Sequence, residues 1–221
     1  QRYLTEGFIV TRDGQYLGMG TGERLVRAVT ELRIEAARHA NPLTFLPGNI
    51  PLTLHIGRLL QGGAPFVACY ADLNHFKPFN DHYGYWRGDE MICLLARTLV
   101  AHADARRDFV GHVGGDDFVV LYQSEDWHAR IEAAVADFNR EAIALFDDEA
   151  RERSGIEAED REGVMRFFPL TTLSVGALRV HPGDFAQPEQ VASAAAAAKH
   201  KAKLLAAGVY VDARAVGAGR A

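Results

Sequence analysis

GHVGGDDFVVL, residues 111–121, is the stretch that decides how this chain folds. Two apolar runs flank a glycine pair and an aspartate pair, a pattern typical of two strands joined by a tight turn. The turn would carry two neighbouring carboxylates, Asp116 and Asp117, beside glycine backbone. Because like charges repel when they are this close, we expect a positive group nearby. A solvated, aspartate-rich turn is the alternative interpretation of this stretch taken alone.

The overall composition is that of an ordinary globular chain. Of its 221 residues, 48% are hydrophobic and 24% are charged. The net charge of -5 argues against a broad nucleic-acid-binding surface, and no apolar run is long enough for a membrane span. Cys69 and Cys93 lie in apolar surroundings, which favours buried thiols in the cytoplasm over a disulfide. The chain begins with Gln1 where Met is usual, which suggests a segment of a longer protein.

Strands and helices alternate along most of the chain. Residues 65–73, PFVACYADL, form a continuous apolar run, as expected of a strand buried on both faces. The hairpin around GGDD, the stretch 167–180 and a terminal VYVD segment supply further strands. Helices are expected over residues 23–40, 50–60, 88–101, 127–146 and 188–207. We therefore expect an α/β or α+β domain with a central sheet, and a charged surface excursion at residues 147–163.

The first 40 residues are organised differently. GFIVTRDGQYLGMGTG, residues 7–22, indicates two strands joined by an Asp13-Gly14 turn. In the helix that follows, apolar residues recur at spacings of four and three, as in a coiled-coil seam: Leu25, Val29, Leu32 and Ala36. An ordinary helix packed on a core fits the same pattern.

Polar side chains crowd the segment that follows the apolar strand, which ends near Asp72. They are Asn74, Lys77, Asn80, Asp81 and Asp89. A carboxylate at a strand end, brought beside those of the GGDD hairpin, makes a hard-oxygen site that suits Mg²⁺ or Mn²⁺ together with substrate phosphates. Glycine backbone would let a phosphate approach closely, and Lys77 could neutralise it. Loop polar residues with a helix N-cap at Asp89 are the alternative.

Other chemistries find little support in the sequence. The chain lacks a GxxxxGK[ST] loop, and Ser174 lacks the first glycine of a nucleophile elbow. The nine histidines show no zinc spacing with the two cysteines. Lys199 and Lys203 share one face of the last helix, where they either reach a polyphosphate or form a solvated basic stripe. Metal-assisted phosphate chemistry is the interpretation that these residues favour.

Ordered motifs over about residues 41–212 resemble the GGDEF family of diguanylate cyclases. GGDDF at 114–118 stands for GGDEF, and DLNHFKPFNDHYGYWRGD at 72–89 is similar to DxDxFKxxNDxxGHxxGD. The remaining motifs are matched by NPLTFLPGN at 41–49, TTLSVGA at 171–177 and AAAKHKAK at 196–203. The resemblance implies a palm-like, mostly antiparallel sheet flanked by helices, in a domain at residues 41–221.

The resemblance also implies a reaction. Two such domains, each holding one GTP and divalent ions, would meet as a homodimer. Each 3′-hydroxyl would attack the α-phosphate of the other GTP, which yields cyclic di-GMP, a bacterial second messenger, and pyrophosphate. Positioning and charge neutralisation, with metal ions clamping an in-line displacement, would supply the catalysis.

Roles carry over to this chain position by position. Metal would be held by Asp72, the Leu73 carbonyl and Asp116. Phosphates would contact the side chains of Lys77, Lys199 and Lys203. They would also contact the backbone at His75, Phe76, Gly114 and Gly115. Asn80 and Asp89 would read guanine, because carboxylate and amide oxygens accept from its N–H groups. Asp117 would help ionise the attacking hydroxyl or hold the second ion.

Several positions depart from the family pattern. Asp117 replaces the usual Glu and is one methylene shorter, so its carboxylate reaches less far. Asn74 replaces the second acid of DxD. Further departures stand at Asn41, Phe45, Ile50, Tyr85, His112 and Lys203. The product-inhibition motif RxxD would need Arg where Ala105 stands before Asp108, so we expect no standard inhibitory site.

These departures leave alternatives to an active cyclase. One is a degenerate, weakly active or inactive GTP-sensing module that controls a fused EAL-type phosphodiesterase. Another is a scaffold that binds no nucleotide. FIVTRDGQYLGMGTGERLVRAVTEL, residues 8–32, resembles the end of a cystathionine-β-synthase-type (CBS) domain running into a signalling helix. We therefore expect residues 1–40 to be such a tail, with CBS and EAL-type domains upstream.

Overall fold

The computed structural model describes residues 7–160, 162–205 and 208–212. Contacts divide the chain into two units, Gln1–Ala40 and Asn41–Ala221. Across the described ranges, no helix is both long enough and apolar enough to cross a membrane.

The first unit is a hairpin followed by a helix. β1 (Gly7–Arg12) and β2 (Gln15–Thr21) pair antiparallel, and Asp13 and Gly14 between them both have positive φ. This is the conformation that a two-residue primed turn requires. α1 (Gly22–Arg38) comes next, and none of its residues is buried. In the described part of this unit no residue is buried at all, so these residues form no core of their own.

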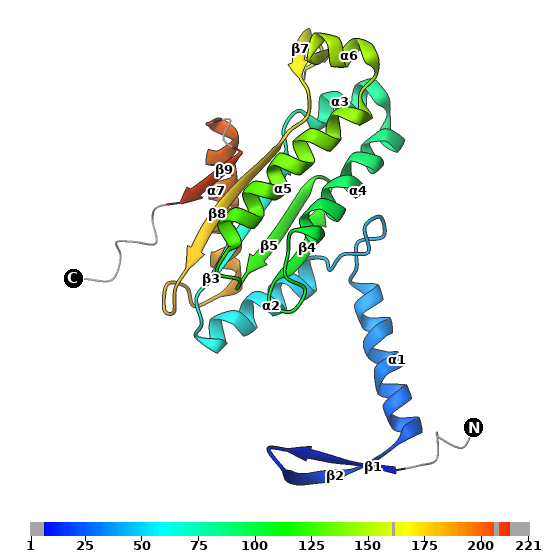
Figure 1. Ribbon diagram of the computed structural model, residues 1–221, viewed down its shortest axis with the longest axis vertical. Helices are drawn as coiled ribbons and strands as arrows, with labels where there is room; N and C mark the ends of the chain where they lie inside the picture. The colour runs from blue at the N-terminus through cyan, green and yellow to red at the C-terminus, as the bar shows by residue number, and fades with distance from the viewer. Residues whose placement is uncertain (1–6, 161, 206–207, 213–221) are drawn as a thin grey trace, which may run out of the picture. The chain divides into compact units, whose positions relative to one another are not determined.

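The second unit is built on a five-stranded sheet (Figure 1). Its strands, in spatial order, are β4 (Phe109–Gly114), β5 (Asp117–Tyr122), β3 (Phe66–Leu73), β8 (Leu173–Val180) and β9 (Val209–Asp212). Neighbouring strands are antiparallel except β8 and β9, which are parallel. The predicted α+β fold with a mostly antiparallel central sheet is confirmed.

Helices cover both faces of this sheet (Figure 1). They are α2 (Asn49–Gly62), α3 (Phe76–Tyr83), α4 (Tyr85–Ala101), α5 (Trp127–Ala142) and α7 (Pro188–Leu204). One core joins α3, α4 and α5 to the sheet, and a second joins α2 and α7 to the opposite face. Because successive strand residues point to opposite faces, Cys69 enters the first core and Ala68 the second. The prediction that β3 is buried on both faces is therefore confirmed.

The expectation of a surface excursion at 147–163 is wrong. The segment contains α6 (Asp148–Arg153) and β6 (Gly155–Glu159), and β6 pairs antiparallel with β7 (Met165–Pro169). One side of these elements is buried, through Ala150, Ile156 and Ala158. The charged residues between them lie on the exposed side, so the composition of the segment concealed its packing.

Two other predicted boundaries differ from the structure, and one predicted end cannot be compared with it. The single strand predicted at 167–180 is two strands, because β7 ends at Pro169 and pairs with β6, whereas β8 belongs to the central sheet. The helix expected to reach residue 146 ends at Ala142 and continues as a 3-10 turn, η2 (Ile143–Leu145). The last helix is α7, and the end predicted for it, Ala207, lies outside the described residues.

α7 lies against the sheet at Gly176 of β8. A Cβ atom added at Gly176 would lie 2.1 Å from the backbone N of Lys199 and 2.2 Å from the carbonyl carbon of Ala198. Both are backbone atoms of α7 and cannot turn aside as a side chain can. The missing side chain at Gly176 therefore sets how closely α7 approaches β8.

Replacing Gly176 with Ala should lower the free energy of unfolding by about 3 kcal/mol, because the added methyl forces α7 away from the sheet. Gly57→Ala is the matched control. It lies within α2, and its new Cβ would make only an ordinary contact, 3.6 Å from Pro188. There the same change should stabilise the protein by about 1 kcal/mol through helix propensity. Urea denaturation of both variants measures the difference, and equal effects would contradict this account.

Candidate functional site

Three aspartates meet at one end of the central sheet. Asp72 lies in the last two residues of β3, Asp116 directly precedes β5, and Asp117 begins it. β3 and β5 are antiparallel neighbours in which Ala71 stands opposite Phe118. The end of β3 therefore adjoins the start of β5, and the GGDD turn lies beside Asp72.

Two lysines of α7 bind these carboxylates. Lys199 Nζ lies 3.0 Å from Asp72 Oδ2 and 2.6 Å from Asp117 Oδ1, and Lys203 Nζ forms an ion pair with Asp72 Oδ1. Lys199 also lies over the ring of Tyr70, 4.4 Å from its centroid. Asp72 is only 6% exposed, so water screens these attractions weakly. The two lysines point into the site, and the alternative of a solvated basic stripe is wrong.

The charges in this cluster shift one another's titration. Burial, the charge of Asp72 and a hydrogen bond with Asp72 together raise the pKa of Asp116 from 3.8 to about 6. Burial lowers the pKa of Lys199, but its hydrogen bonds and ion pairs with Asp117 and Asp72 outweigh burial, and the pKa is raised overall. Lys199 is therefore a permanent cation of the site, whereas Asp116 carries an unfavourable negative charge.

The donor set suits a hard divalent cation that substrate phosphates help to hold. Among the residues that the structure describes, no three acidic, histidine or cysteine side chains gather closely enough to hold a metal ion unaided. Asp72 and Asp116 nevertheless supply adjoining carboxylates, and the buried Asp72 Oδ1 forms an ion pair with Lys203. Mg²⁺ is commonly held by one or two carboxylates together with phosphates. These residues therefore fit such an ion.

A hollow of about 670 Å³ opens beside these carboxylates. Predicted site residues line much of it: Asp72, Leu73, His75, Phe76, Lys77, Asn80, Asp116 and Lys203. Glu159, Asp160 and Phe168, from β6, β7 and the turn between them, line it as well. The sequence reasoning missed this wall, because it treated the segment as a surface excursion.

The remaining predicted residues do not line this hollow. Asp117 is linked to Asp72, which does line it, because Lys199 forms ion pairs with both carboxylates. Gly114 and Gly115 lie in the exposed turn before β5. Asp89 lines a second hollow, on α4. The two predicted guanine readers therefore border different hollows.

Polar side chains in the segment from Asn74 to Asp81 also have partners in the structure. The Asn74 amide donates to Thr172 Oγ1 at 2.9 Å and to Ser174 Oγ at 2.7 Å, so this replacement of an acid has a structural role. Lys77 forms an ion pair with Asp81 one helical turn away.

His112, noted from the sequence only as a departure, holds the GGDD turn in place. The residue is 2% exposed, and its ring stacks on Phe118 with ring centroids 4.1 Å apart. Nε2 lies 2.9 Å from the Gly115 carbonyl oxygen, and Nδ1 lies 2.9 Å from Thr44 Oγ1. Because a carbonyl can only accept, Nε2 carries the hydrogen and Nδ1 accepts from the hydroxyl. A neutral imidazole therefore ties the turn to the loop before α2.

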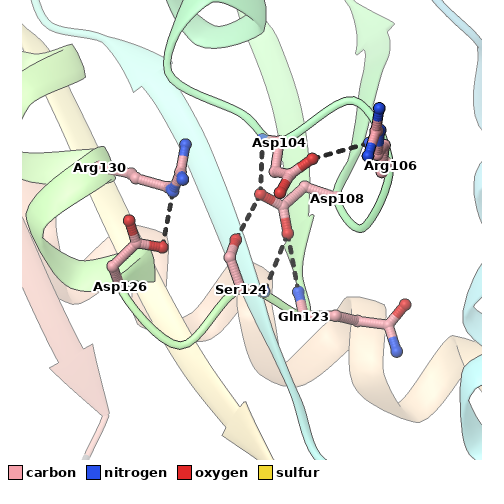
Figure 2. Close-up of polar contacts among 7 residues, drawn as sticks. All are labelled: Asp104, Arg106, Asp108, Gln123, Ser124, Asp126 and Arg130. Carbon is pink, nitrogen blue, oxygen red and sulfur yellow. Dashed lines mark hydrogen bonds and ion pairs between the residues drawn. The ribbon is translucent and has the colours of Figure 1, made fainter.

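Figure 2 shows Asp108, the surviving acid of the RxxD motif. Its Oδ1 accepts from the backbone N–H groups of Gln123 at 2.9 Å and Ser124 at 3.1 Å. Its Oδ2 accepts from the Asp104 N–H at 2.8 Å and from the Ser124 hydroxyl at 2.5 Å. This carboxylate closes its own loop and ties it to the end of β5. The absence of a standard inhibitory site stays a prediction.

Asp108→Ala should lower the free energy of unfolding by about 3 kcal/mol, because it leaves three N–H groups and a hydroxyl without their acceptor. Asp126→Ala is the control from the same region (Figure 2). Asp126 pairs with Arg130 at 2.7 Å, but its side chain is 59% exposed, and exposed ion pairs contribute little. Thermal and urea unfolding of the two variants provide the comparison. Similar losses would show that Asp108 is no more structural than Asp126.

The stability of the protein should fall on acidification partly through His112. Burial lowers the pKa of this imidazole, although the Gly115 carbonyl and Asp117 raise it in part. The unfolded chain therefore takes up the proton more readily, and stability is lost as pH falls through the ordinary histidine pKa of 6.5. His112→Gln should cost about 1–2 kcal/mol at pH 7 and lose less stability between pH 7 and 5 than wild type. Urea unfolding at both pH values tests this, and parallel losses would refute it.

Comparison with known proteins agrees with this arrangement. The family described as "Diguanylate cyclase, GGDEF domain" matches residues 38–159, more than half of the chain. The chain is 30% identical over 106 residues to diguanylate cyclase DgcP of Pseudomonas aeruginosa, covering 43% of this chain and 16% of DgcP. It is 34% identical over 106 residues to the bifunctional diguanylate cyclase/cyclic di-GMP phosphodiesterase MucR of the same organism, covering 46% of this chain and 15% of MucR. The matches thus cover about one sixth of each curated relative.

Solved structures share the fold. Diguanylate cyclase SiaD of Pseudomonas aeruginosa, crystallised with its activator SiaC, superposes with a TM-score of 0.63 at 21% identity, over 86% of this chain and 67% of SiaD. The coiled coil and GGDEF domain of DgcB from Caulobacter crescentus, in complex with c-di-GMP, superposes with a TM-score of 0.59 at 21% identity, over 86% of this chain and 93% of that one. At these identities the likeness shows the fold, and the family match shows the membership: this chain belongs to the GGDEF family of diguanylate cyclase domains.

Proposed function

We propose that residues 41–212 form a domain that binds GTP with Mg²⁺ or Mn²⁺ and, as a homodimer, joins two GTP molecules into cyclic di-GMP. Two pyrophosphates are released. The observation that carries the proposal is the cluster of Asp72, Asp116 and Asp117 at the sheet end, with Lys199 beside it. Membership of the GGDEF family supports the same reaction.

The acidic cluster has the chemistry for phosphoryl transfer. Divalent ions bound by Asp72, the Leu73 carbonyl and Asp116 would polarise the α-phosphate and favour ionisation of the attacking 3′-hydroxyl. Asp117 accepts the proton of that hydroxyl. Lys199 and Lys203 offset the charge of the phosphates, as charge-assisted hydrogen bonds do elsewhere.

The segment after β3 binds the nucleotide. Backbone N–H groups of His75 and Phe76, at the start of α3, meet phosphate oxygens, since a helix N-terminus favours an anion. Lys77 adds a positive charge, and the Gly114–Gly115 backbone admits close approach. Asn80 reads guanine together with Asp89. The Asn80 Oδ1 atom is buried without a hydrogen-bond partner, which favours a ligand that donates to it.

A second candidate function is a GTP-sensing module with little turnover. The geometry of Asp117 favours it, because this carboxylate is shorter than Glu and is held by Lys199 at 2.6 Å. A catalytic group out of place costs about a hundredfold in rate. Such a module would control a fused EAL-type phosphodiesterase.

The first unit would link the domain to partners. Leu25, Val29 and Leu32 of α1 are 50%, 41% and 70% exposed, which supports pairing with a second copy of the chain. Ile9 and Met19 of the hairpin are 67% and 69% exposed, as expected if an upstream CBS domain covers them. Because GTP is a cytoplasmic substrate, we place the domain in the cytoplasm.

Product analysis tests the reaction. Concentrated protein incubated with GTP and Mg²⁺ or Mn²⁺ should yield cyclic di-GMP, detected by chromatography with mass detection. Asp116→Asn keeps the size of the side chain but removes the charge, and should lower the yield by about a hundredfold or more. Asp126→Asn removes an exposed carboxylate elsewhere and should change nothing.

Two outcomes would change the conclusion. Full activity in Asp116→Asn would refute the proposed metal site. No product from wild type, together with a GTP-dependent rise in melting temperature, would favour the sensing module. In that case Asp117→Glu, which restores the longer carboxylate, should produce measurable turnover.

A further inference from the structure

α4 begins with two aromatic side chains that face solvent. Tyr85 is 83% exposed and Trp86 is 82% exposed, whereas Trp127, the other tryptophan, is only 8% exposed. Burying an indole is among the largest hydrophobic gains that a side chain offers. An exposed tryptophan at the rim of a hollow is available to contact a ligand there.

Trp86 borders a hollow of about 620 Å³, a size typical of small-molecule sites. Its apolar walls come from Leu43, Cys93, Leu94 and Leu145. Acidic side chains line it too, at Asp89, Glu90 and Glu141, against one cation, Arg97. Apolar walls with carboxylate acceptors suit a heteroaromatic ring whose edge carries N–H donors, as guanine does.

This hollow lies next to the one that contains the acidic cluster. Tyr85 lines the cluster's hollow and Trp86 lines this one, although the two are consecutive residues. A Cβ atom added at Gly88 would lie 1.8 Å from Asn80 Oδ1, so the Asn80 amide packs against α4 directly beside Asp89. The turn from α3 to α4 thus stands between the two hollows.

The length of α3 matches a nucleotide. Its eight residues extend about 12 Å from the first turn to the last. That is a span that a nucleoside triphosphate reaches, with its phosphates at the start of α3 and its base beyond Tyr83. A nucleotide bound in this direction would place its base near the start of α4, where Trp86 lies, and its phosphates near Lys77.

We propose that Trp86 stacks on the guanine base of the bound nucleotide and is a positioning residue of this site. The inference rests on the GTP binding proposed above, and the positions carried over from the family motif do not include Trp86. The indole holds the plane of the base while Asn80 and Asp89 meet its edge. Because the stack is made equally with substrate and transition state, it lowers KM and leaves kcat unchanged.

Intrinsic fluorescence tests the stack directly. Trp127→Phe leaves Trp86 as the single indole, and titration with a GTP analogue bearing an α,β-methylene bridge, which cannot release pyrophosphate, should quench it saturably. The midpoint should equal the Kd from calorimetry. Trp86→Phe keeps Trp127 as its single indole, and the analogue should no longer quench its fluorescence.

Affinity provides the second readout. Trp86→Ala should weaken binding of the analogue about tenfold, as loss of a base–aromatic stack does. In turnover it should raise KM by the same factor without lowering kcat. Phe45→Ala is the matched control, since Phe45 is 80% exposed and is absent from the lining of both hollows. The affinity of Phe45→Ala for the analogue should stay within twofold of that of the wild-type protein.

The outcomes separate this inference from the function on which it rests. Wild-type affinity in Trp86→Ala, with no fluorescence response in Trp127→Phe, overturns the stack and leaves GTP binding intact. A wild-type protein that fails to bind the analogue in calorimetry overturns both.

Discussion

The charge balance at Asp72 is the interaction on which the rest of the site depends. Asp72 is 6% exposed, and a carboxylate buried to that extent without partners would be strongly unfavourable. α7 supplies both partners, Lys199 and Lys203, and it comes close enough because Gly176 has no side chain. The position of α7, the burial of Asp72 and the charge of the site therefore depend on one another.

The same balance would link the proposed binding of a cation to that of phosphates. A divalent cation at Asp72 and Asp116 would compete with Lys199 and Lys203 for the same oxygens. Two positive groups and a divalent ion would then crowd a few carboxylates, which is unfavourable in a partly buried site. The phosphates of the proposed GTP would replace, as partners of the lysines, the carboxylate oxygens that the cation takes. Cation and nucleotide should accordingly bind far better together than either does alone.

The sequence predicted the sheet well, because the continuous apolar run of β3 is typical of a strand buried on both faces. Asp72 lies at the end of that run. It predicted that Lys199 and Lys203 share one face of α7 but not that this face contacts the aspartates. Periodicity says which residues share a face and not what that face packs against. It missed β6, where only Ile156 and Ala158 are buried among charged neighbours. Two alternating apolar residues are too short a signal to predict a strand. The sequence therefore also missed the wall that β6 contributes to the hollow beside the aspartates.

His112 shows why single departures from a family pattern cannot be judged one at a time. A neutral, buried imidazole stands where the family usually has Arg, so a positive charge near Asp117 is gone. Lys199 keeps a positive charge beside it, at 2.6 Å from the Asp117 carboxylate. His112 fixes the turn through Gly115, and α7 fixes the cation. The reach of Asp117 is therefore set by the position of α7 as much as by its missing methylene, and a shorter acid on a turn held from both sides retains a defined place in the site.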